Sequence, residues 1–251
     1  MKSELTAVIL AAGLGKRMKS DKAKVLHEIN GKPMVMYVIE AAKKIAVNNI
    51  VVVVGKQAET VESVVSAEFD VIFALQKEQL GTGHAVRCAL PVLPENTAQV
   101  LILCGDVPLI SHGTLKNLYE EHLRLNRDIT VLAVESPDPK GYGRIILDDE
   151  KNVSGIIEEA DATDDQKRIN IVNSGIYCVK RNFLEYSLDE IGSDNAQGEF
   201  YLTDIVKIGY NYKKNTGAVI SRDKEEFLGV NSVKDLLAVE RVMKKRLGII
   251  S

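Results

Sequence analysis

Two runs of consecutive apolar residues constrain the fold of this chain more than any other feature. Val51 to Val54 is four valines in a row, and Val100 to Leu103 reads Val-Leu-Ile-Leu. A strand with one face in water alternates apolar and polar residues, whereas these runs contain no polar position. Strands of this kind belong to parallel sheets that helices cover on both faces.

Segments typical of strands and of helices alternate through the first half of the chain. Pro33 suits the first turn of one helix, in which Met34, Val38, Ala42 and Ile45 recur on one face. This alternation predicts a Rossmann-like, doubly wound, mostly parallel α/β sheet. The predicted strands are Thr6 to Ala11, Ile50 to Val54, Val71 to Leu75, Val100 to Cys104 and Ile129 to Val134, and the predicted helices are Pro33 to Ala46, Ala58 to Ala67, Gly83 to Leu90 and Leu115 to Leu125.

After Pro137 the pattern changes to shorter strands separated by a polar stretch. We expect a small mixed or antiparallel β extension that covers the C-terminal edge of the sheet. An amphipathic helix over Val233 to Leu247, with Ser232 and Asp235 as a capping pair, follows near the C-terminus. The other elements predicted here are strands at Arg144 to Leu147, Val153 to Glu158, Ile171 to Val179 and Ala218 to Ser221, and a helix from Glu199 to Tyr210.

Composition excludes several kinds of partner. The 251 residues carry a net charge of −3 with no long run of either sign, so neither a nucleic acid nor an anionic membrane is indicated. The sequence shows no signal peptide and no apolar run near the ~20 residues of a membrane span, which predicts a cytoplasmic protein. Cys88, Cys104 and Cys178 are too few and too widely separated for a disulfide framework or a zinc site.

A glycine-containing loop follows the first predicted strand and leads into basic residues. It reads Leu10-Ala11-Ala12-Gly13-Leu14-Gly15-Lys16-Arg17-Met18. Glycines let backbone N–H groups approach an anion, and Arg17 with Lys24 supplies charge for a polyphosphate. The loop lacks the Ser or Thr that follows Gly-Lys in a Walker motif, and Met18 replaces the third glycine of the dinucleotide fingerprint. The alternative is a surface turn with solvated basic residues.

Polar residues follow the ends of other predicted strands, where ligands bind in open α/β sheets. Asp106 follows its strand after a single glycine, a position suited to Mg²⁺. Gln76, Gly81 and Thr82 offer groups that pair with a base edge or a phosphate. Turn, capping and strand-end roles are the simpler alternatives for all these positions. Hydroxyl-rich ligands are held by carboxylates, amides and backbone groups, and the candidates for this are Gly143, Glu158 and Asn173.

These motifs, in this order along almost the whole chain, resemble the sugar-nucleotidyltransferase family. They are most similar to the uridyltransferase half of the bacterial bifunctional N-acetylglucosamine-1-phosphate uridyltransferase/glucosamine-1-phosphate acetyltransferase. Many nucleotidyltransferases share the glycine loop with Lys24-Val25-Leu26, whereas Gln76 to Ala85 and Asn195 to Glu199 are more specific. The other segments that carry the resemblance are Gly105 to Ile110, Gly141 to Ile145, Asp161 to Thr163 and Gly229 to Asn231.

The resemblance implies a fold of the nucleotide-diphospho-sugar transferase type and a set of site residues. Arg17 and Lys24 are the implied catalytic residues, because they face the phosphates of the nucleotide. Asp106 and Asn231 are implied to bind the catalytic Mg²⁺, for which Mn²⁺ can substitute. The implied substrate-binding residues are Leu10, Ala11, Ala12, Gly13, Lys24, Cys104, Gly105, Asp106 and Asn231, with Gln76, Gly81 and Thr82 on uracil and with Gly143, Glu158 and Asn173 on the acetamido sugar.

The implied reaction transfers the uridylyl group of UTP to N-acetyl-α-D-glucosamine 1-phosphate. Its products are pyrophosphate and UDP-N-acetylglucosamine, a precursor of the cell wall. A uridylyl- or thymidylyltransferase for another hexose 1-phosphate and a non-catalytic nucleotide-sugar sensor are the alternatives. Two positions depart from the family pattern: Cys104 stands where an aromatic residue is common, and Glu159-Ala160 stands where a His-Lys pair is common.

The same resemblance predicts how the chain is divided. We expect a nucleotidyltransferase domain over residues 1–231 and a C-terminal helical arm over 232–251, with nucleotide-binding and sugar-binding parts at 1–110 and 111–231. The sequence has no hexapeptide repeat, so we expect the family's β-helix acetyltransferase domain to be absent. Because the family's trimer contacts lie mainly in that domain, we expect a monomer or weak oligomer that performs only uridyl transfer.

Overall fold

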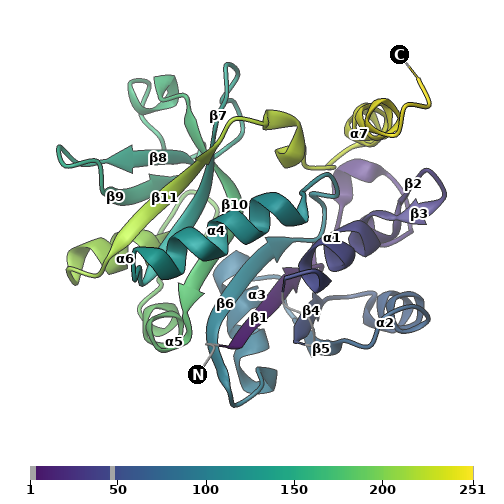
Figure 1. The fold of residues 1–251 in the computed structure, drawn as a ribbon, viewed down its shortest axis with the longest axis horizontal. Helices are drawn as coiled ribbons and strands as arrows, with labels where there is room; N and C mark the ends of the chain where they lie inside the picture. The colour runs from purple at the N-terminus through teal and green to yellow at the C-terminus, as the bar shows by residue number, and fades with distance from the viewer. Residues whose placement is uncertain (1–3, 46–48, 251) are drawn as a thin grey trace.

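The computed structural model describes residues 4–45 and 49–250, which form a mixed β-sheet with helices on both faces (Figure 1). The main path of the sheet has the strand order β11-β7-β10-β6-β1-β4-β5. The strands at one end of this order pair in parallel, and all residues of β4 are buried, as the apolar runs predict. These strands are β1 (Glu4–Leu10), β4 (Ile50–Val54), β5 (Ile72–Leu75) and β6 (Thr97–Cys104).

Helices cover the two faces of the sheet in two sets. One face packs against α1, α2 and α4 and the other against α3, α5 and α6, with Ile9 and Val8 of β1 pointing into different cores. The predicted α/β fold is confirmed, but the predicted end of the first helix at Ala46 lies outside the described residues. The bounds are α1 (Met34–Lys43), α2 (Ala58–Ser66), α3 (Thr82–Ala89), α4 (His112–Arg124), α5 (Arg181–Asp189) and α6 (Asp204–Asn211).

Strand β10 (Ile171–Lys180) lies near the middle of the sheet, not in an extension at its edge as predicted. It runs antiparallel to both β6 and β7 (Ile129–Glu135), so it joins the two halves of the sheet. A bulge interrupts its pairing with β7 between Asn173 and Ile176. The run from Ile176 to Val179 is buried at every position, which is the pattern of a central strand.

The remaining strands flank this central one. The hairpin of β8 (Arg144–Leu147) and β9 (Val153–Ile157) forms the small antiparallel extension and joins β10 through Val172. At the other side β11 (Thr216–Ser221) pairs in parallel with β7. A short hairpin, β2 (Glu28–Ile29) with β3 (Lys32–Pro33), follows the glycine loop and was not predicted, nor was α5.

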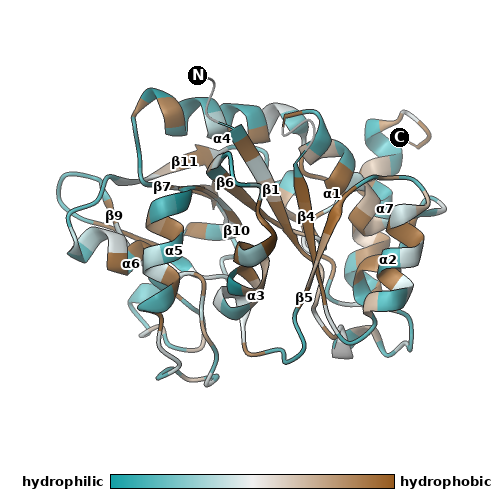
Figure 2. Cartoon of the chain, turned by 90° about the horizontal axis from the view of Figure 1, so that it is seen from below, coloured by the Kyte–Doolittle hydropathy of each residue, from teal (hydrophilic) through white to brown (hydrophobic). Residues whose placement is uncertain are grey.

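The last helix, α7 (Val233–Arg246), begins with the predicted capping box of Ser232 and Asp235. Its buried face packs beside β2 and α1, at the opposite end of the sequence (Figure 1). In the described part of the chain no helix is long and apolar enough to cross a membrane. Apolar residues concentrate on the strands and on the helix faces that cover them (Figure 2). Cys88, Cys104 and Cys178 are free thiols, of which Cys178 is buried and the other two are partly buried.

His122 is a fully buried polar side chain between α4 and the sheet. Its two ring nitrogens lie 2.9 Å from Thr130 Oγ1 and 2.9 Å from Gln99 Oε1. The neutral ring satisfies both contacts, because one nitrogen accepts from the hydroxyl while the other donates to the amide oxygen. Burial, and to a smaller extent Lys180 and Arg127, lowers the pKa of His122 to about 4.

This histidine makes stability depend on pH. In the unfolded chain its pKa is the ordinary 6.5, so the unfolded state takes up a proton first as the pH falls from 6.5 toward 4. The free energy of unfolding therefore falls, by about 2 kcal/mol at pH 5. We expect urea unfolding at pH 7.5 and pH 5 to show this loss in the wild type and a loss smaller by that amount in His122→Gln. An equal loss in both proteins would contradict the assignment.

Candidate functional site

The carboxyl ends of β1 and β6 meet in a corner built from predicted residues. Gly105 N–H donates to Leu10 C=O over 2.9 Å just beyond the strands. A Cβ on Gly105 would lie 2.9 Å from that carbonyl oxygen, so the turn requires glycine. Ala11 N–H bonds Val53 C=O of β4, and Ala11 and Ala12 are both buried. The corner therefore holds the start of the glycine loop rigidly against the sheet.

One ammonium group joins three segments that are far apart in the sequence. Lys24 Nζ donates to Asp106 Oδ2 in a short ion pair and to Asn231 Oδ1 over 2.8 Å. The Lys24 side chain is 11% exposed and that of Asp106 24% exposed, so water screens the pair only in part. The structure thus brings together the two predicted metal ligands and one predicted catalytic cation, which we call the Lys24 cluster.

The glycine loop lies directly against Lys24. Gly15 has a φ of +60°, and a Cβ there would lie 2.7 Å from Lys24 Cβ, so this contact needs glycine. Gly13 is exposed, with no atom within 4 Å of the place where its Cβ would lie. Arg17 is also exposed, and in the described residues no hydrogen bond or ion pair joins it to the Lys24 cluster. The loop therefore lies with its backbone against Lys24 and carries an exposed cation at Arg17.

The oxygen atoms of the Lys24 cluster fit a divalent cation that arrives with its substrate. Asp106 Oδ2 and Asn231 Oδ1 contact the same ammonium group, so both point toward one cation position. Mg²⁺ is usually held by one or two protein carboxylates together with substrate phosphates. Within residues 4–45 and 49–250 no group of three His, Cys, Asp or Glu residues is placed to hold a metal alone. The donor set suits Mg²⁺ bound jointly with a phosphate.

The three predicted sugar-binding residues also lie together, at the bulge of β10. Asn173 N–H donates to Gly143 C=O over 2.8 Å, and a Cβ on Gly143 would lie 3.4 Å from Glu158 Oε2. The Asn173 side chain donates to Tyr177 Oη over 2.7 Å and accepts from Gly175 N–H over 3.0 Å. The buried Tyr177 was not predicted, although its place in the apolar run of β10 marks it as internal. Asn173 is therefore fixed by the bulge.

Within this group, the surroundings of Glu158 disfavour the charge of its carboxylate. Burial raises its pKa, and the negative charges of Asp161 and Asp204 add to that effect. The nearby Thr203 side chain and the positive charge of Arg144 oppose the shift without cancelling it. The ionised form of Glu158 is thus less stable here than in water.

Gln76, Gly81 and Thr82 fix the loop between β5 and α3. Gln76 is 3% exposed, and its Nε2 donates to Gly81 C=O over 3.1 Å. Thr82 Oγ1 accepts from Leu202 N–H over 3.0 Å, so the simpler interpretation of Thr82 as a helix cap is wrong, because Gly81 is the N-cap. Gly83 N–H bonds Phe200 C=O. This contact ties the backbone of Phe200 to the start of α3, and α6 begins at Asp204 and not at Glu199 as predicted.

The two positions that depart from the family pattern both have partners in the structure. Cys104 Sγ donates to Gly175 C=O over 3.4 Å, and burial raises its thiol pKa to about 12. A Cβ on Gly175 would lie 2.8 Å from this sulfur, so the bulge packs closely on β6. Glu159 pairs with Arg144, whose side chain is 1% exposed, over 2.6 Å. Glu159 thus neutralises a buried cation.

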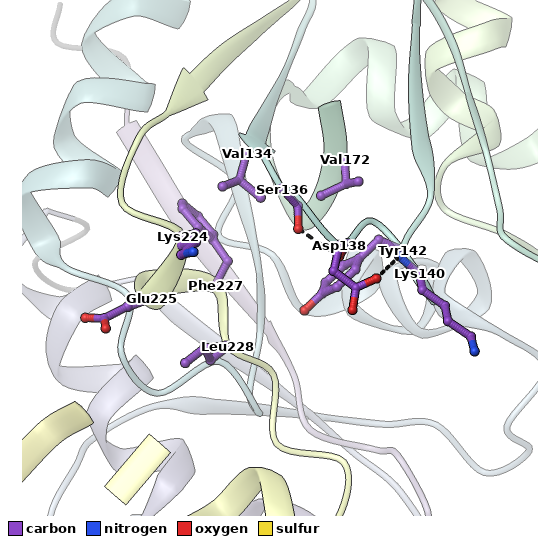
Figure 3. Close-up of a pocket in the computed structure, with 10 residues that line it drawn as sticks. All are labelled: Val134, Ser136, Asp138, Lys140, Tyr142, Val172, Lys224, Glu225, Phe227 and Leu228. Atoms are coloured by element: carbon purple, nitrogen blue, oxygen red, sulfur yellow. Dashed lines mark hydrogen bonds between the residues drawn. The ribbon is translucent and has the colours of Figure 1, made fainter. Parts of the chain in front are cut away.

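Two regions beside the site were not predicted. A shallow pocket is lined by the glycine loop from Ala11 to Leu14 together with Gly55, Lys56 and Gln57, which follow the valine run of β4. A larger pocket of about 400 Å³ has Tyr142 and Phe227 in its wall (Figure 3). It lies on the face of β10 that carries Val172 and contains none of the predicted site residues. Its residues are Val134, Ser136, Asp138, Lys140, Tyr142, Val172, Lys224, Glu225, Phe227 and Leu228.

The sheet, the glycine loop and the polar groups at the carboxyl ends of β1 and β6 define a class of α/β domains that bind nucleotides at this edge. The chain belongs to the family of MobA-like NTP transferase domains, whose family model matches residues 7–166. The predicted resemblance to nucleotidyltransferases is therefore confirmed.

Relatives of known name match almost the whole of this chain. The chain is 50% identical over 244 residues to the Bifunctional protein GlmU of Caldanaerobacter subterraneus subsp. tengcongensis, covering 97% of this chain and 52% of that protein. It is 46% identical over 245 residues to the Bifunctional protein GlmU of Geotalea uraniireducens, covering 98% and 54%. The chain spans about half the length of the curated relatives it matches.

Solved structures share the fold. A putative glucose-1-phosphate thymidylyltransferase from Bacillus anthracis superposes with a TM-score of 0.73 at 19% identity, covering 95% of this chain and 94% of that one. HddC from Yersinia pseudotuberculosis superposes with a TM-score of 0.71 at 23% identity, covering 95% and 99%. These similarities confirm the predicted fold class.

The raised pKa of Glu158 predicts that a neutral side chain at this position stabilises the fold. Because its folded pKa is raised, Glu158 stabilises the fold below its ordinary pKa of 4.5, and that contribution is lost as the pH rises through the folded pKa. We therefore expect Glu158→Gln to unfold at a higher urea concentration than the wild type at pH 7, with the difference shrinking below pH 4.5. Glu150→Gln, at an exposed position in the turn between β8 and β9, is the control and should leave the midpoint unchanged. A Glu158→Gln protein less stable at pH 7 would contradict the interpretation.

Proposed function

We propose that this chain transfers the uridylyl group of UTP to N-acetyl-α-D-glucosamine 1-phosphate and releases UDP-N-acetylglucosamine and pyrophosphate. The observation that carries the proposal is the contact of Lys24 Nζ with Asp106, at the carboxyl end of β6, and with Asn231, in the segment before α7. It supplies a cation and two oxygen ligands where ligands bind in this fold. The similarity to proteins named GlmU supports the choice of uridine and of the N-acetylated sugar.

In this proposal the protein positions two anions and neutralises their charge. The phosphate of the sugar is the nucleophile that attacks the α-phosphorus, so no protein nucleophile is needed. Asp106 and Asn231 would hold Mg²⁺, which when bound supplies charge stabilisation at the phosphates. Lys24 and Arg17 add positive charge beside the glycine loop, while the buried Gln76 and the Thr82 loop would receive the base. Gly143, Glu158 and Asn173 would hold the sugar.

Pyrophosphate release tests the reaction. UTP and dTTP are each combined with the 1-phosphates of N-acetylglucosamine, glucose and galactose, and the sugar nucleotides are identified. We expect the greatest kcat/KM for UTP with N-acetylglucosamine 1-phosphate. A preference for another pair would replace the substrate assignment and keep the chemistry. Binding of the sugar nucleotide without turnover of any pair would favour the sensor.

Substitution of either cationic side chain tests the assignment of Lys24 and Arg17 to the phosphates. We expect Lys24→Ala and Arg17→Ala each to lower kcat/KM by about 10²-fold or more, because both charges act on the transition state. Lys22→Ala is the matched control: Lys22 is an exposed neighbour that pairs with Glu28, and its loss should change kcat/KM by no more than about 2-fold. Steady-state kinetics with near-wild-type values for both Lys24→Ala and Arg17→Ala would rule the assignment out.

The metal requirement is a separate prediction. We expect turnover to stop in excess EDTA, to return with Mg²⁺ or Mn²⁺, and to fall by at least about 10²-fold in Asp106→Asn, because a hard cation needs the anionic oxygen. Full turnover of the wild type in EDTA would show that Asp106 and Asn231 serve Lys24 alone.

A further inference from the structure

The carboxylate of Asp235 at the start of α7 makes more contacts than a helix cap requires. In the capping box, Asp235 N–H donates to Ser232 Oγ over 3.3 Å, and Asp235 Oδ2 accepts from Ser232 N–H over 2.8 Å. The same oxygen also accepts from Asn231 N–H over 3.0 Å. The cap therefore extends one residue beyond the helix end, onto the backbone of a residue in the Lys24 cluster.

The backbone N–H that precedes Asn231 in the chain is bound by a different segment. Val230 N–H donates to Asp106 C=O over 2.9 Å. The backbone of Asn231 is thus held at two neighbouring N–H groups. Its own N–H is bound by Asp235 and that of Val230 by the backbone of Asp106, while its side-chain oxygen contacts Lys24. The segment that carries Asn231 has no regular secondary structure of its own, so these two contacts are its backbone anchors beside the Lys24 cluster.

The apolar face of α7 packs on residues that lie near Arg17, Asp106 and Asn231 in the sequence. Val239 and Met243 of α7 belong to a buried group with Met18, next to Arg17, and with Leu109, which follows Asp106. Val230, next to Asn231, completes the group on this side. At the far end of the helix, Arg246 donates to Leu109 C=O over 3.1 Å. The helix is therefore fixed relative to the loops that carry the charged groups.

We propose that Asp235 is a positioning residue that aims Asn231 at the cation position, and that α7 acts as a structural part of the active site. The inference rests on the proposed function, in which Asn231 holds the metal. Groups that orient a metal ligand from behind affect metal affinity by about 10- to 100-fold, although they never touch the metal. Asp235 has this relation to Asn231, acting through the backbone amide and not through the side chain.

Binding of Mn²⁺ to the whole chain in the presence of saturating UDP-N-acetylglucosamine, which supplies the phosphate ligands, is followed by electron paramagnetic resonance of the free ion and tests the proposal without turnover. We expect Asp235→Ala to raise the Kd for Mn²⁺ about 10-fold. Asp235→Asn keeps an amide oxygen that can accept from both backbone N–H groups, and we expect it to bind Mn²⁺ within about 3-fold of the wild type. In kinetics, Asp235→Ala should raise the Mg²⁺ concentration for half-maximal rate by a similar factor, with kcat recovering at saturating Mg²⁺.

A matched control separates positioning from loss of a helix cap. Ser111 caps α4 through Thr114 N–H over 3.1 Å, so Ser111→Ala removes a comparable cap at another helix. We expect it to lower the unfolding midpoint as Asp235→Ala does and to leave the Kd for Mn²⁺ within about 2-fold of the wild type. Equal weakening of Mn²⁺ binding by Asp235→Ala and Ser111→Ala would overturn the proposal. Weak Mn²⁺ binding in Asp235→Asn would also overturn it, because the lost charge and not the lost hydrogen bonds would then be the cause.

Asn231→Ala distinguishes this inference from the proposed function. If it weakens Mn²⁺ binding and Asp235→Ala does not, the positioning role is wrong and the metal assignment stands. If Asn231→Ala itself leaves Mn²⁺ binding unchanged, the metal assignment and the positioning role are both wrong. Weakening by both variants, with rescue by Asp235→Asn, supports the proposal.

Discussion

The ammonium of Lys24 is the group on which the site depends. A charge with so little exposure costs several kcal/mol unless it is paired and hydrogen-bonded. Its partners come from the end of β6 and from the segment before α7, so the cost of an unpaired charge favours the one arrangement in which these distant segments meet. Gly15 and Gly105 are needed because any larger residue would keep the backbone out of this corner.

Much of the first half of the fold could be predicted, because a parallel strand covered on both faces leaves an unmistakable apolar run. The valines of β4 and the run in β6 are both of this kind. Residues at the carboxyl ends of these strands, such as Asp106, could be predicted for the same reason. The contact of Lys24 with Asn231 could not be derived from spacing, since 207 residues separate them, and it was anticipated only through the resemblance to a family.

The second half was harder to predict because its determinants are tertiary. Asn173 reads as a turn residue, and only the bulge of β10 shows that its side chain is tied to Tyr177 and Gly175. The backbone of Phe200 is tied to Gly83 before α6 begins, a contact that no local propensity reveals. Glu158 adds a destabilising contribution of its own, because a half-buried carboxylate beside two others weakens the fold, and residues with this property are often found at functional sites.

The central place of β10 has a consequence for how the chain is assembled during synthesis. β7 and β11 reach the parallel half of the sheet only through β10, which ends at Lys180. A ribosome therefore has to deliver the chain as far as Lys180 before the open edge of β6 is covered. Until then that edge offers unpaired backbone groups to other nascent chains. Such long-range closure is slow relative to local helix formation, so the protein is expected to depend on protection of this edge while it is being made.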